Sequence, residues 1–363
     1  METGLILASA LVAFATSVAF MVALRPIALK IGLLDMPGGR KRHEGYIPII
    51  GGLAMFAGIF TGLLLLPIPA KFVHSIFAAS LILVVTGVCD DRFGLSASAR
   101  IISQIVAVLL MVYGAGLRLA DIGDPFGTGI VSMGSFTLVF TLLVTLTMIN
   151  AYNLVDGADG LAGSLTLIAL LAVALVSGAH HPSAAEALTV SAAVIGFLLF
   201  NYPTRRNRRM RSFMGDAGST MLGFMVVWIT LGVSQGEARV ISPVHCLWFA
   251  SIPIYDCLTC FVRRAMKGRS PFRPGRDHFH HVLFRGGFSV RSTLAILTGL
   301  QLMYALIGIA GHFAGVADVL MFAAWSLLFV TQRAIIRQLG RLHRCYKLRK
   351  LKRLRAPGVP AST

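Results

Sequence analysis

The sequence predicts an all-α, polytopic membrane protein with about eleven transmembrane helices. Of its 363 residues, 56% are hydrophobic and only 13% are charged, and the mean hydropathy is +0.77. A soluble domain of this composition could not cover its own surface with polar side chains, so lipid must solvate part of it. The apolar residues also fall into runs of about 16–22 residues, most of them long enough for a helix to cross a bilayer.

Short polar segments separate eleven apolar runs. The predicted spans are 4–24, 49–66, 72–89, 101–118, 135–150, 161–178, 184–202, 217–234, 241–262, 293–312 and 316–333. The first run has no basic residue before it and is longer than a signal-peptide core, so we interpret it as a retained helix. Residues 1–336 are therefore expected to form a single transmembrane domain, and residues 337–363 a basic tail. The Gly-rich stretch 121–134 is expected to form a small hairpin.

Lys and Arg side chains indicate the orientation. With the N-terminus outside, 30 of the 33 basic residues fall on the inner side. The positive-inside rule then predicts a periplasmic N-terminus and a cytoplasmic C-terminus. Because topology accounts for most of the net charge of +18, we do not expect nucleic-acid binding. The basic stretch 341–355 carries leucines at intervals and is interpreted as a surface helix on anionic membrane lipids.

Nine of the 15 acidic residues lie on the same inner side, and the first candidate site is the pair Asp90 and Asp91. The pair follows a long apolar run, where even one ionised group is disfavoured. Adjacent carboxylates repel, so a cation or a shared proton would stabilise them. The alternative interpretation is a polar helix end that faces water.

A second segment links two predicted spans and is rich in oxygen ligands. Asn153, Asp156 and Asp159 stand three residues apart, so they share one face of a helix or turn. Gly157 and Gly160 permit close approach of a ligand to the backbone. Carboxylate and amide oxygens suit Mg²⁺. Asp and Gly are also common turn residues, which is the simpler interpretation of this segment.

The third segment, 213–220, follows five arginines between positions 205 and 211. Asp216 is a further candidate metal ligand, and Phe213 is a candidate platform for stacking a base. The backbone N–H groups of Gly215, Gly218 and Ser219 would lie at a helix start, which suits anions. The arginines by themselves are typical of topology signals and lipid-headgroup contacts.

The fourth segment is the basic loop 263–291. It contains Arg276, His278, His280 and His281, residue types that bind phosphate oxygens. A His-rich run can also bind zinc, but no Cys accompanies it, so we favour phosphate. The Cys257-x-x-Cys260 pair lies inside an apolar span and is interpreted as two neighbours on one helix face.

Together the four segments place oxygen ligands and phosphate-binding cations on one side of one membrane. This combination favours Mg²⁺-dependent transfer between a diphosphate substrate and a lipid-embedded molecule. The chain resembles the polyprenyl-phosphate N-acetylhexosamine-1-phosphate transferase family over essentially its whole length. The matching residues are 40–44 with Pro48, Gly51 and Gly52, then 90–93, 153–160, 213–219, 270–272 and 278–281.

The resemblance implies a bacterial inner-membrane enzyme whose active site faces the cytoplasm. It implies transfer of N-acetylglucosamine 1-phosphate from UDP-N-acetylglucosamine to undecaprenyl phosphate, with release of UMP. The product would begin lipid-linked surface polysaccharides such as lipopolysaccharide O-antigen. Mg²⁺ is the implied cofactor, with Mn²⁺ as a substitute, and a homodimer is compatible with the family.

The resemblance also implies roles for individual residues. Asp216 and Asn153, with Asp90, would hold Mg²⁺ against the diphosphate. Asp159 and Phe213 would address the uracil, and Asp90 or Asp91 would orient or deprotonate the lipid phosphate. The candidate catalytic residues are Asp90, Asp91, Asp156, Asp159 and His280, and the candidates for binding phosphate or sugar are Arg100, Arg276, His278, His280 and His281.

Several alternatives stay open. The related peptidoglycan translocase usually has Lys soon after its Asp pair, whereas here Arg92, Phe93 and Gly94 follow and Arg100 is the next cation. This departure points away from a muramoyl-pentapeptide donor, but another UDP-N-acetylhexosamine is an alternative. A non-catalytic transporter is disfavoured because the ionisable groups cluster on one side and no half-repeat is seen. Direct attack by the lipid phosphate is favoured over a phospho-aspartate intermediate.

Overall fold

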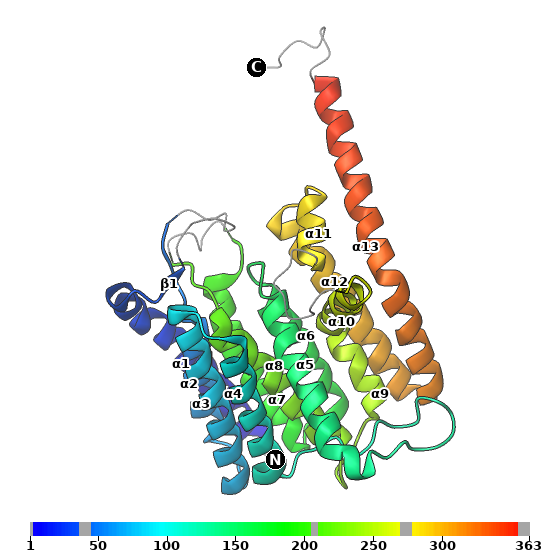
Figure 1. The fold of residues 1–363 in the computed structure, drawn as a ribbon. Coiled ribbons are helices and arrows are strands. Elements are labelled where there is room, and N and C mark those ends of the chain that lie inside the picture. The colour runs from blue at the N-terminus through cyan, green and yellow to red at the C-terminus, as the bar shows by residue number, and fades with distance from the viewer. Residues whose placement is uncertain (1–2, 36–44, 205–209, 269–277, 355–363) are drawn as a thin grey trace.

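The computed structural model describes residues 3–35, 45–204, 210–268 and 278–354, which form a bundle of helices (Figure 1). Its longer helices are α1 (Thr3–Ile31), α2 (Gly51–Leu63), α3 (Ala70–Phe93), α4 (Ala97–Leu109), α5 (Thr137–Val155), α6 (Leu161–Ser177), α7 (Pro182–Asn201), α8 (Gly215–Ser234), α10 (Ser251–Ala265), α12 (Val290–Phe313) and α13 (Asp318–Leu354). The short elements are β1 (Leu34–Asp35), β2 (Ile47–Pro48), η1 (Leu110–Gly114), η2 (Gly134–Phe136), α9 (Pro243–Cys246), η4 (Leu247–Ala250) and α11 (Phe279–Arg285).

The described residues contain nine helical segments that are long and apolar enough to cross a membrane. They coincide with nine of the predicted spans, so the prediction of an all-α membrane protein is confirmed. The other two predicted spans, 49–66 and 161–178, are the shorter apolar helices α2 and α6, of 13 and 17 residues. Whether these two also cross the bilayer, as a count of eleven requires, stays a prediction.

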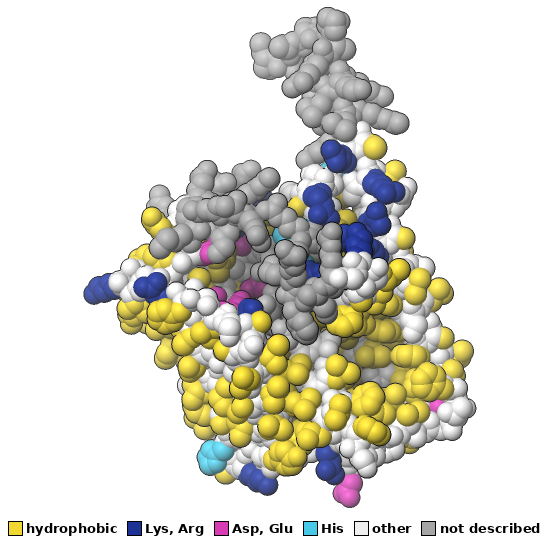
Figure 2. Space-filling view, in the orientation of Figure 1, with side chains coloured by type: hydrophobic (Ala, Val, Ile, Leu, Met, Phe, Trp, Pro, Cys, Tyr) yellow, Lys and Arg dark blue, Asp and Glu magenta, His cyan; other side chains and the backbone are white. Residues whose placement is uncertain are grey.

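Helix α8 forms the centre of the bundle. It packs against α2, α3, α5, α6 and α7, and 83% of the residues in its most apolar 18-residue stretch are buried. A helix that is apolar on all sides belongs in such a position, and Trp228 and Phe224 are fully buried there. The peripheral helices α1, α4 and α13 are mostly exposed, and their apolar side chains contribute to the hydrophobic band in Figure 2.

The predicted span 241–262 is broken and does not form one continuous helix. It consists of α9, the 3₁₀ turn η4 and α10. Pro253 has no N–H to donate to the Phe249 carbonyl, and the side chain of Gln301 on α12 donates instead, at 2.9 Å. The Gln301 amide also donates to the Trp248 carbonyl at 3.1 Å and accepts from Ile252 N at 2.8 Å. A polar side chain therefore satisfies the interrupted backbone inside the apolar bundle, where water cannot.

Two features lie at opposite ends of the bundle. The predicted hairpin at 121–134 is present, with an antiparallel bridge between Asp121 and Ser132. At the other end α13 projects from the bundle (Figure 1). It is one helix of 37 residues, about 55 Å at 1.5 Å per residue. The basic stretch 341–355 therefore continues the last apolar helix as far as Leu354 and does not begin a separate surface helix as predicted.

Candidate active site

Five aspartates from three segments meet near the end of the bundle from which α13 projects, where Figure 2 shows acidic side chains in a hollow. Asp90 and Asp91 lie in the last turn of α3, and Asp216 lies in the first turn of α8. Asp156 and Asp159 lie in the turn between α5 and α6. All five are sequence-predicted site residues, and the structure brings them to one end of the molecule.

Two glycines bring these segments together. A Cβ atom on Gly87 would lie 2.3 Å from the backbone of Ala217, and a Cβ on Gly52 would lie 2.3 Å from the backbone N of Gly218. Only glycine allows α2 and α3 to approach the start of α8 this closely, which is the small-residue packing typical of membrane helices. Because Gly87 precedes Asp90 by one helical turn, this contact sets the Asp pair beside Asp216.

Asn153 connects the α5 end to the start of α8. Its amide nitrogen donates to Asp216 Oδ1 at 2.8 Å and to Ser219 Oγ at 3.1 Å. The oxygen and nitrogen of an amide are assigned from its neighbours, and a half-turn would aim the Asn153 oxygen at the same point. Asn153 and Asp216 can thus present two oxygen ligands side by side.

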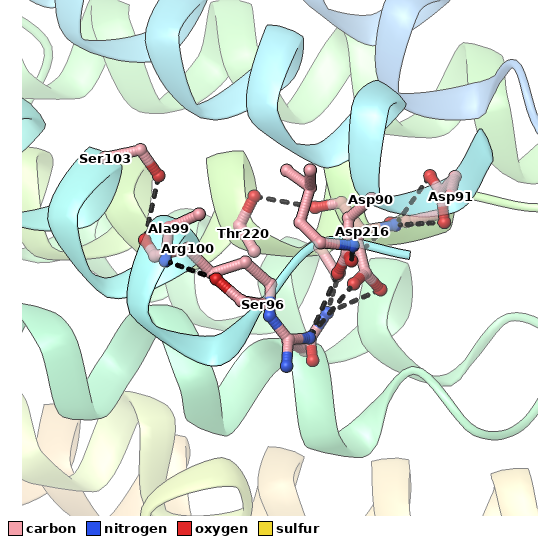
Figure 3. A network of polar contacts seen from close by, with 12 residues as sticks. Asp90, Asp91, Ser96, Ala99, Arg100, Ser103, Asp216 and Thr220 are labelled. Atoms are coloured by element: carbon pink, nitrogen blue, oxygen red, sulfur yellow. Dashed lines mark hydrogen bonds and ion pairs between the residues drawn. The ribbon is translucent and has the colours of Figure 1, made fainter. Parts of the chain in front are cut away.

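Arg100 bridges two of the carboxylates (Figure 3). Its Nη1 donates to Asp90 Oδ2 at 3.0 Å and lies 3.8 Å from Asp216 Oδ2. The Asp90 and Asp216 side chains are also within hydrogen-bonding reach of each other. Asp90 is further fixed by the Leu95 N–H, which donates to its Oδ1. A basic group that can contact phosphate therefore sits at the edge of the carboxylate pair.

Asp91 holds the start of α8. The Asp216 backbone N–H donates to both carboxylate oxygens of Asp91, at 3.0 and 3.2 Å. A negative side chain at a helix N-terminus stabilises the helix dipole. Gly215 has φ +72°, and a Cβ there would lie 2.4 Å from the Asp91 carboxylate. The two members of the Asp pair thus differ: Asp90 faces Arg100, whereas Asp91 positions the backbone that carries Asp216.

Asp156 lies among the other carboxylates and is only partly exposed. Burial raises the pKa of Asp156 well above its usual range, and the charges of Asp216, Asp91 and Asp159 raise it further. Accumulated negative charge of this kind is relieved by a cation. The raised pKa of Asp156 therefore indicates that the carboxylates at this end of the bundle favour a bound cation.

Asp159 forms an ion pair with Arg211. The Arg211 guanidinium also lies over the ring of Phe213, 5.1 Å from the ring centre, in a cation–π arrangement. Asp159 and Phe213, the two residues predicted to address a base, thus share one neighbour. Arg211 was not predicted as a site residue, because it belongs to a run of five arginines that is typical of a topology signal. Its position two residues before Phe213 is the sequence feature that indicates a role in the site.

Helix α11, which carries His280 and His281, contacts the turn between α5 and α6 through His280. A Cβ on Gly157 would lie 2.3 Å from His280 Nε2, so glycine is needed for this approach. Burial lowers the pKa of His280 well below its usual range, and the neighbouring charges of His281 and His278 act in the same direction. The His281 ring lies 4.2 Å from the His280 ring, centre to centre. A neutral imidazole therefore adjoins the Asn153–Asp159 turn.

His278 does not fit the predicted role of a phosphate or sugar ligand. It is buried, and its Nδ1 lies 2.9 Å from Asp256 Oδ2 and 3.5 Å from Cys260 Sγ. Burial disfavours the charged imidazole, but these hydrogen bonds outweigh it and raise the pKa of His278 to about 10. The Phe279 N–H donates to the other oxygen of Asp256 at 2.8 Å, so Asp256 also holds the start of α11.

This contact also corrects the statement that no Cys accompanies the histidines, because folding brings Cys260 of α10 to His278. Among the described residues, one group of three His, Cys, Asp or Glu side chains has its ligand atoms close enough together to hold a metal ion. The group consists of Asp256, Cys260 and His278. Their mutual hydrogen bonds already satisfy them, and we interpret them as a buried ion pair. Arg276, another predicted phosphate ligand, lies outside the described residues.

The residues at the α3–α8 junction fit a hard divalent cation by their chemistry. Asp90 and Asp216 offer carboxylate oxygens and Asn153 an amide oxygen, the donor types that Mg²⁺ prefers. Mg²⁺ commonly takes only one or two carboxylates from the protein and completes its shell with water and substrate phosphates. A pair of carboxylates with one amide is therefore enough.

The fold and this junction define an integral membrane protein with a carboxylate-rich site at one end of its helix bundle, bordered by arginine and histidine. Comparison with known proteins identifies the family. Residues 73–234 match the family described as "Glycosyl transferase family 4". The chain belongs to the polyprenyl-phosphate N-acetylhexosamine-1-phosphate transferase family.

Relatives match along nearly the whole chain, and each carries the name undecaprenyl-phosphate alpha-N-acetylglucosaminyl 1-phosphate transferase. The Yersinia pestis protein is 36% identical over 346 residues, which is 94% of this chain and 94% of the relative. The Escherichia coli K12 protein is 36% identical over 352 residues, 95% of each chain. The Pasteurella multocida protein is 36% identical over 360 residues, 97% of this chain and 100% of the relative.

Proposed function

We propose that this protein transfers N-acetylglucosamine 1-phosphate from UDP-N-acetylglucosamine to undecaprenyl phosphate. The products are undecaprenyl-diphospho-N-acetylglucosamine and UMP, and the lipid product begins a surface polysaccharide such as lipopolysaccharide O-antigen. The observation that carries the proposal is the convergence of Asp90, Asn153 and Asp216 beside Arg100, in a chain whose full-length relatives bear the name of this transferase.

The proposal includes an orientation. The carboxylate end faces the cytoplasm of a bacterial inner membrane, the N-terminus is periplasmic, and α2 and α6 complete eleven spans. The distribution of Lys and Arg supports this arrangement, because 30 of 33 belong to segments assigned to that side. UDP-sugars are cytoplasmic and polyprenyl phosphates are membrane-embedded, so a site at this boundary can receive both.

The acceptor is already a nucleophile, so the residues mainly align two anions that repel each other. Asp90, Asn153 and Asp216 would hold Mg²⁺, which would neutralise charge on the diphosphate. Arg100, at the edge of this group, binds the phosphate oxygens of the acceptor. The lipid phosphate then attacks the sugar-bearing phosphorus directly, and UMP leaves.

The other residues of the site select and orient the donor. Phe213 stacks on the uracil while Asp159, held by Arg211, accepts a hydrogen bond from it. His280 and His281 lie beside the α5–α6 turn and donate hydrogen bonds to the sugar or its phosphate. Asp156 has a raised pKa, and a cation bound beside it would favour its ionised form. Removing uracil contacts should therefore raise KM for the donor more than it lowers kcat.

UMP release tests the proposal. Purified protein in detergent is given undecaprenyl phosphate, Mg²⁺ and a panel of UDP-N-acetylhexosamines and UDP-muramoyl-pentapeptide. We expect release with UDP-N-acetylglucosamine, loss of release with a chelator and recovery when Mg²⁺ is returned. The variant Asp216→Asn should keep its fold and lose at least about 100-fold in rate, because a metal ligand is removed rather than a packing residue.

The matched control is Asp124→Asn in the hairpin at the opposite end of the bundle, where Asp124 accepts a hydrogen bond from Gly129 that an amide can also accept. This variant should release UMP at the wild-type rate. A wild-type protein that releases no UMP with any donor would favour the transporter alternative. Full activity in D216N would remove Asp216 from the metal site.

A further inference from the structure

A second concave surface lies outside the carboxylate site, between α10, α11 and α13. It encloses about 850 Å³. We call it the basic groove. Its lining includes Lys267 after α10, Arg285 on α11, and Arg337, Arg341 and Arg344 on α13, together with apolar side chains.

Helix packing builds the basic groove. Gly286 after α11 meets Gly340 on α13, where a Cβ on Gly286 would lie 2.6 Å from the Gly340 Cα. The ring of Phe288 stacks on His343, with ring centres 4.0 Å apart. These contacts hold the projecting part of α13 against the loop that follows α11, so the groove is a feature of the packed fold.

The charged side chains that line the basic groove are all positive among the described residues. Seven Lys or Arg residues line it, and no Asp or Glu is among the described residues that do so. From position 278 to the C-terminus the sequence contains a single acidic residue, Asp318, at the far end of α13. Like charges spaced four residues apart destabilise a helix, and Arg337 and Arg341 are spaced in this way. An anion in the groove would relieve this repulsion.

The basic groove is also apolar at one side. Val262, Met266, Phe329 and Val330 line it together with the cations, and Met266 and Val330 are 82% and 72% exposed. Val262, Phe329 and Val330 belong to helices that carry candidate membrane spans, and Met266 directly follows α10. In Figure 2 the Lys and Arg side chains gather directly beyond the hydrophobic band. A ligand here needs an anionic head and an apolar tail.

We propose that the basic groove binds the headgroup of an anionic membrane phospholipid, with its acyl chains along the apolar side. Basic pockets between membrane helices are known to accept such headgroups. The polyprenyl-phosphate acceptor is a less suitable occupant, because α11 stands between the groove and the carboxylates. Its His280 packs on Gly157 in the site, whereas Val282 and Arg285 line the groove.

Thermal unfolding of the full-length protein in mixed micelles tests this binding and requires no turnover. Phosphatidylglycerol is titrated into the micelles, with phosphatidylcholine as the uncharged comparison. We expect only phosphatidylglycerol to raise the unfolding temperature of the wild type. The double variant Arg337→Gln, Arg341→Gln should need on the order of tenfold more phosphatidylglycerol for the same rise, because each basic residue near an anionic surface contributes to binding.

The matched control is Lys71→Gln, Arg118→Gln, which removes two exposed charges from elsewhere in the bundle. It should respond like the wild type. If R337Q/R341Q does not fold, Lys267→Gln, Arg344→Gln tests the same groove from the turn after α10 and from α13. An equal response of groove and control variants would overturn the proposal. So would an equal rise produced by inorganic pyrophosphate, which would indicate a site for soluble anions, or preferential binding of undecaprenyl phosphate.

Discussion

Asp256 and His278 form a buried ion pair that links α10 to the start of α11. Each partner makes a second contact, Asp256 with the Phe279 N–H and His278 with Cys260. Removing one member of a buried pair leaves the other charge without compensation, which is more destabilising than losing a surface pair. The pair therefore fixes the position of α11, and through α11 the approach of His280 to Gly157.

We expect the variant Asp256→Asn to be about 3 kcal/mol less stable than the wild type at pH 6. The folded-state pKa of His278, about 10, exceeds its ordinary value of 6.5. The stability that the pair contributes is therefore complete below about pH 6.5 and is lost as the pH rises through about 10. Unfolding temperatures in detergent should show a gap between wild type and D256N that narrows over this range.

The same measurement in a protein without His278 separates the ion pair from the other contact of Asp256. In a protein that already carries His278→Gln, the effect of D256N should be smaller and should not change with pH between 6 and 10. A gap of constant size in the wild-type background would mean that Asp256 acts only through the Phe279 N–H, and the ion pair would have no energetic role.

For single residues, the sequence indicated which side chains belong to the site better than it indicated which side chains contact each other. Asp90, Asn153 and Asp216 were selected because oxygen ligands are rare beside apolar runs, and the structure brings them together. Asp256 was passed over, although an acidic residue inside an apolar span is itself an indication of a special contact. Its partner stands 22 positions away, and no local pattern specifies such a pairing.

At the scale of elements, the approach of α3 to α8 decides whether the carboxylates meet. The variant Gly87→Ala places a methyl group about 2.3 Å from the backbone of Ala217, so the two helices must separate. Displacements of about 1 Å in an active site can cost about 100-fold in rate. We expect G87A to remain folded and to lose UMP release by roughly this factor.

Gly299→Ala is the matched control, because no heavy atom lies within 4 Å of a Cβ at this exposed position on α12. Alanine favours a helix over glycine by about 1 kcal/mol, so G299A should keep its activity and unfold at the same or a higher temperature. Equal activity in G87A and G299A would show that the α3–α8 contact does not position the site.

Helix positions were predictable because long apolar runs have few other conformations in a bilayer. The break in the span 241–262 was not predicted, although Pro253 stands in the middle of this apolar run and lacks the N–H that a continuous helix needs there. The partner that makes the break acceptable, Gln301, belongs to α12. The continuation of α13 past residue 337 differs from the predicted tail, because the change to polar composition at this point does not end the helix.

For the whole molecule, charge is distributed along the bundle axis. The carboxylate site and the basic groove lie at the end from which α13 projects, whereas the 121–134 hairpin lies at the other end (Figure 1). Most of the net charge of +18 is therefore located at one end of the molecule and is not spread evenly over its surface. A membrane with a negative inner surface would orient such a molecule with this end inward.

Two cysteines at opposite ends can report this orientation. Cys345 on α13 is an exposed native thiol, and Phe126 in the hairpin is 61% exposed, so Phe126→Cys places a second reporter there. A membrane-impermeant maleimide added to intact spheroplasts should label F126C and leave Cys345 unmodified until the membrane is permeabilised. The variant F126C/C345S is compared with C345S to give the hairpin signal, and the unchanged chain is compared with C345S to give the α13 signal. Cys345 labelling in intact spheroplasts would reverse the proposed orientation and place the carboxylates on the side that lacks UDP-sugars.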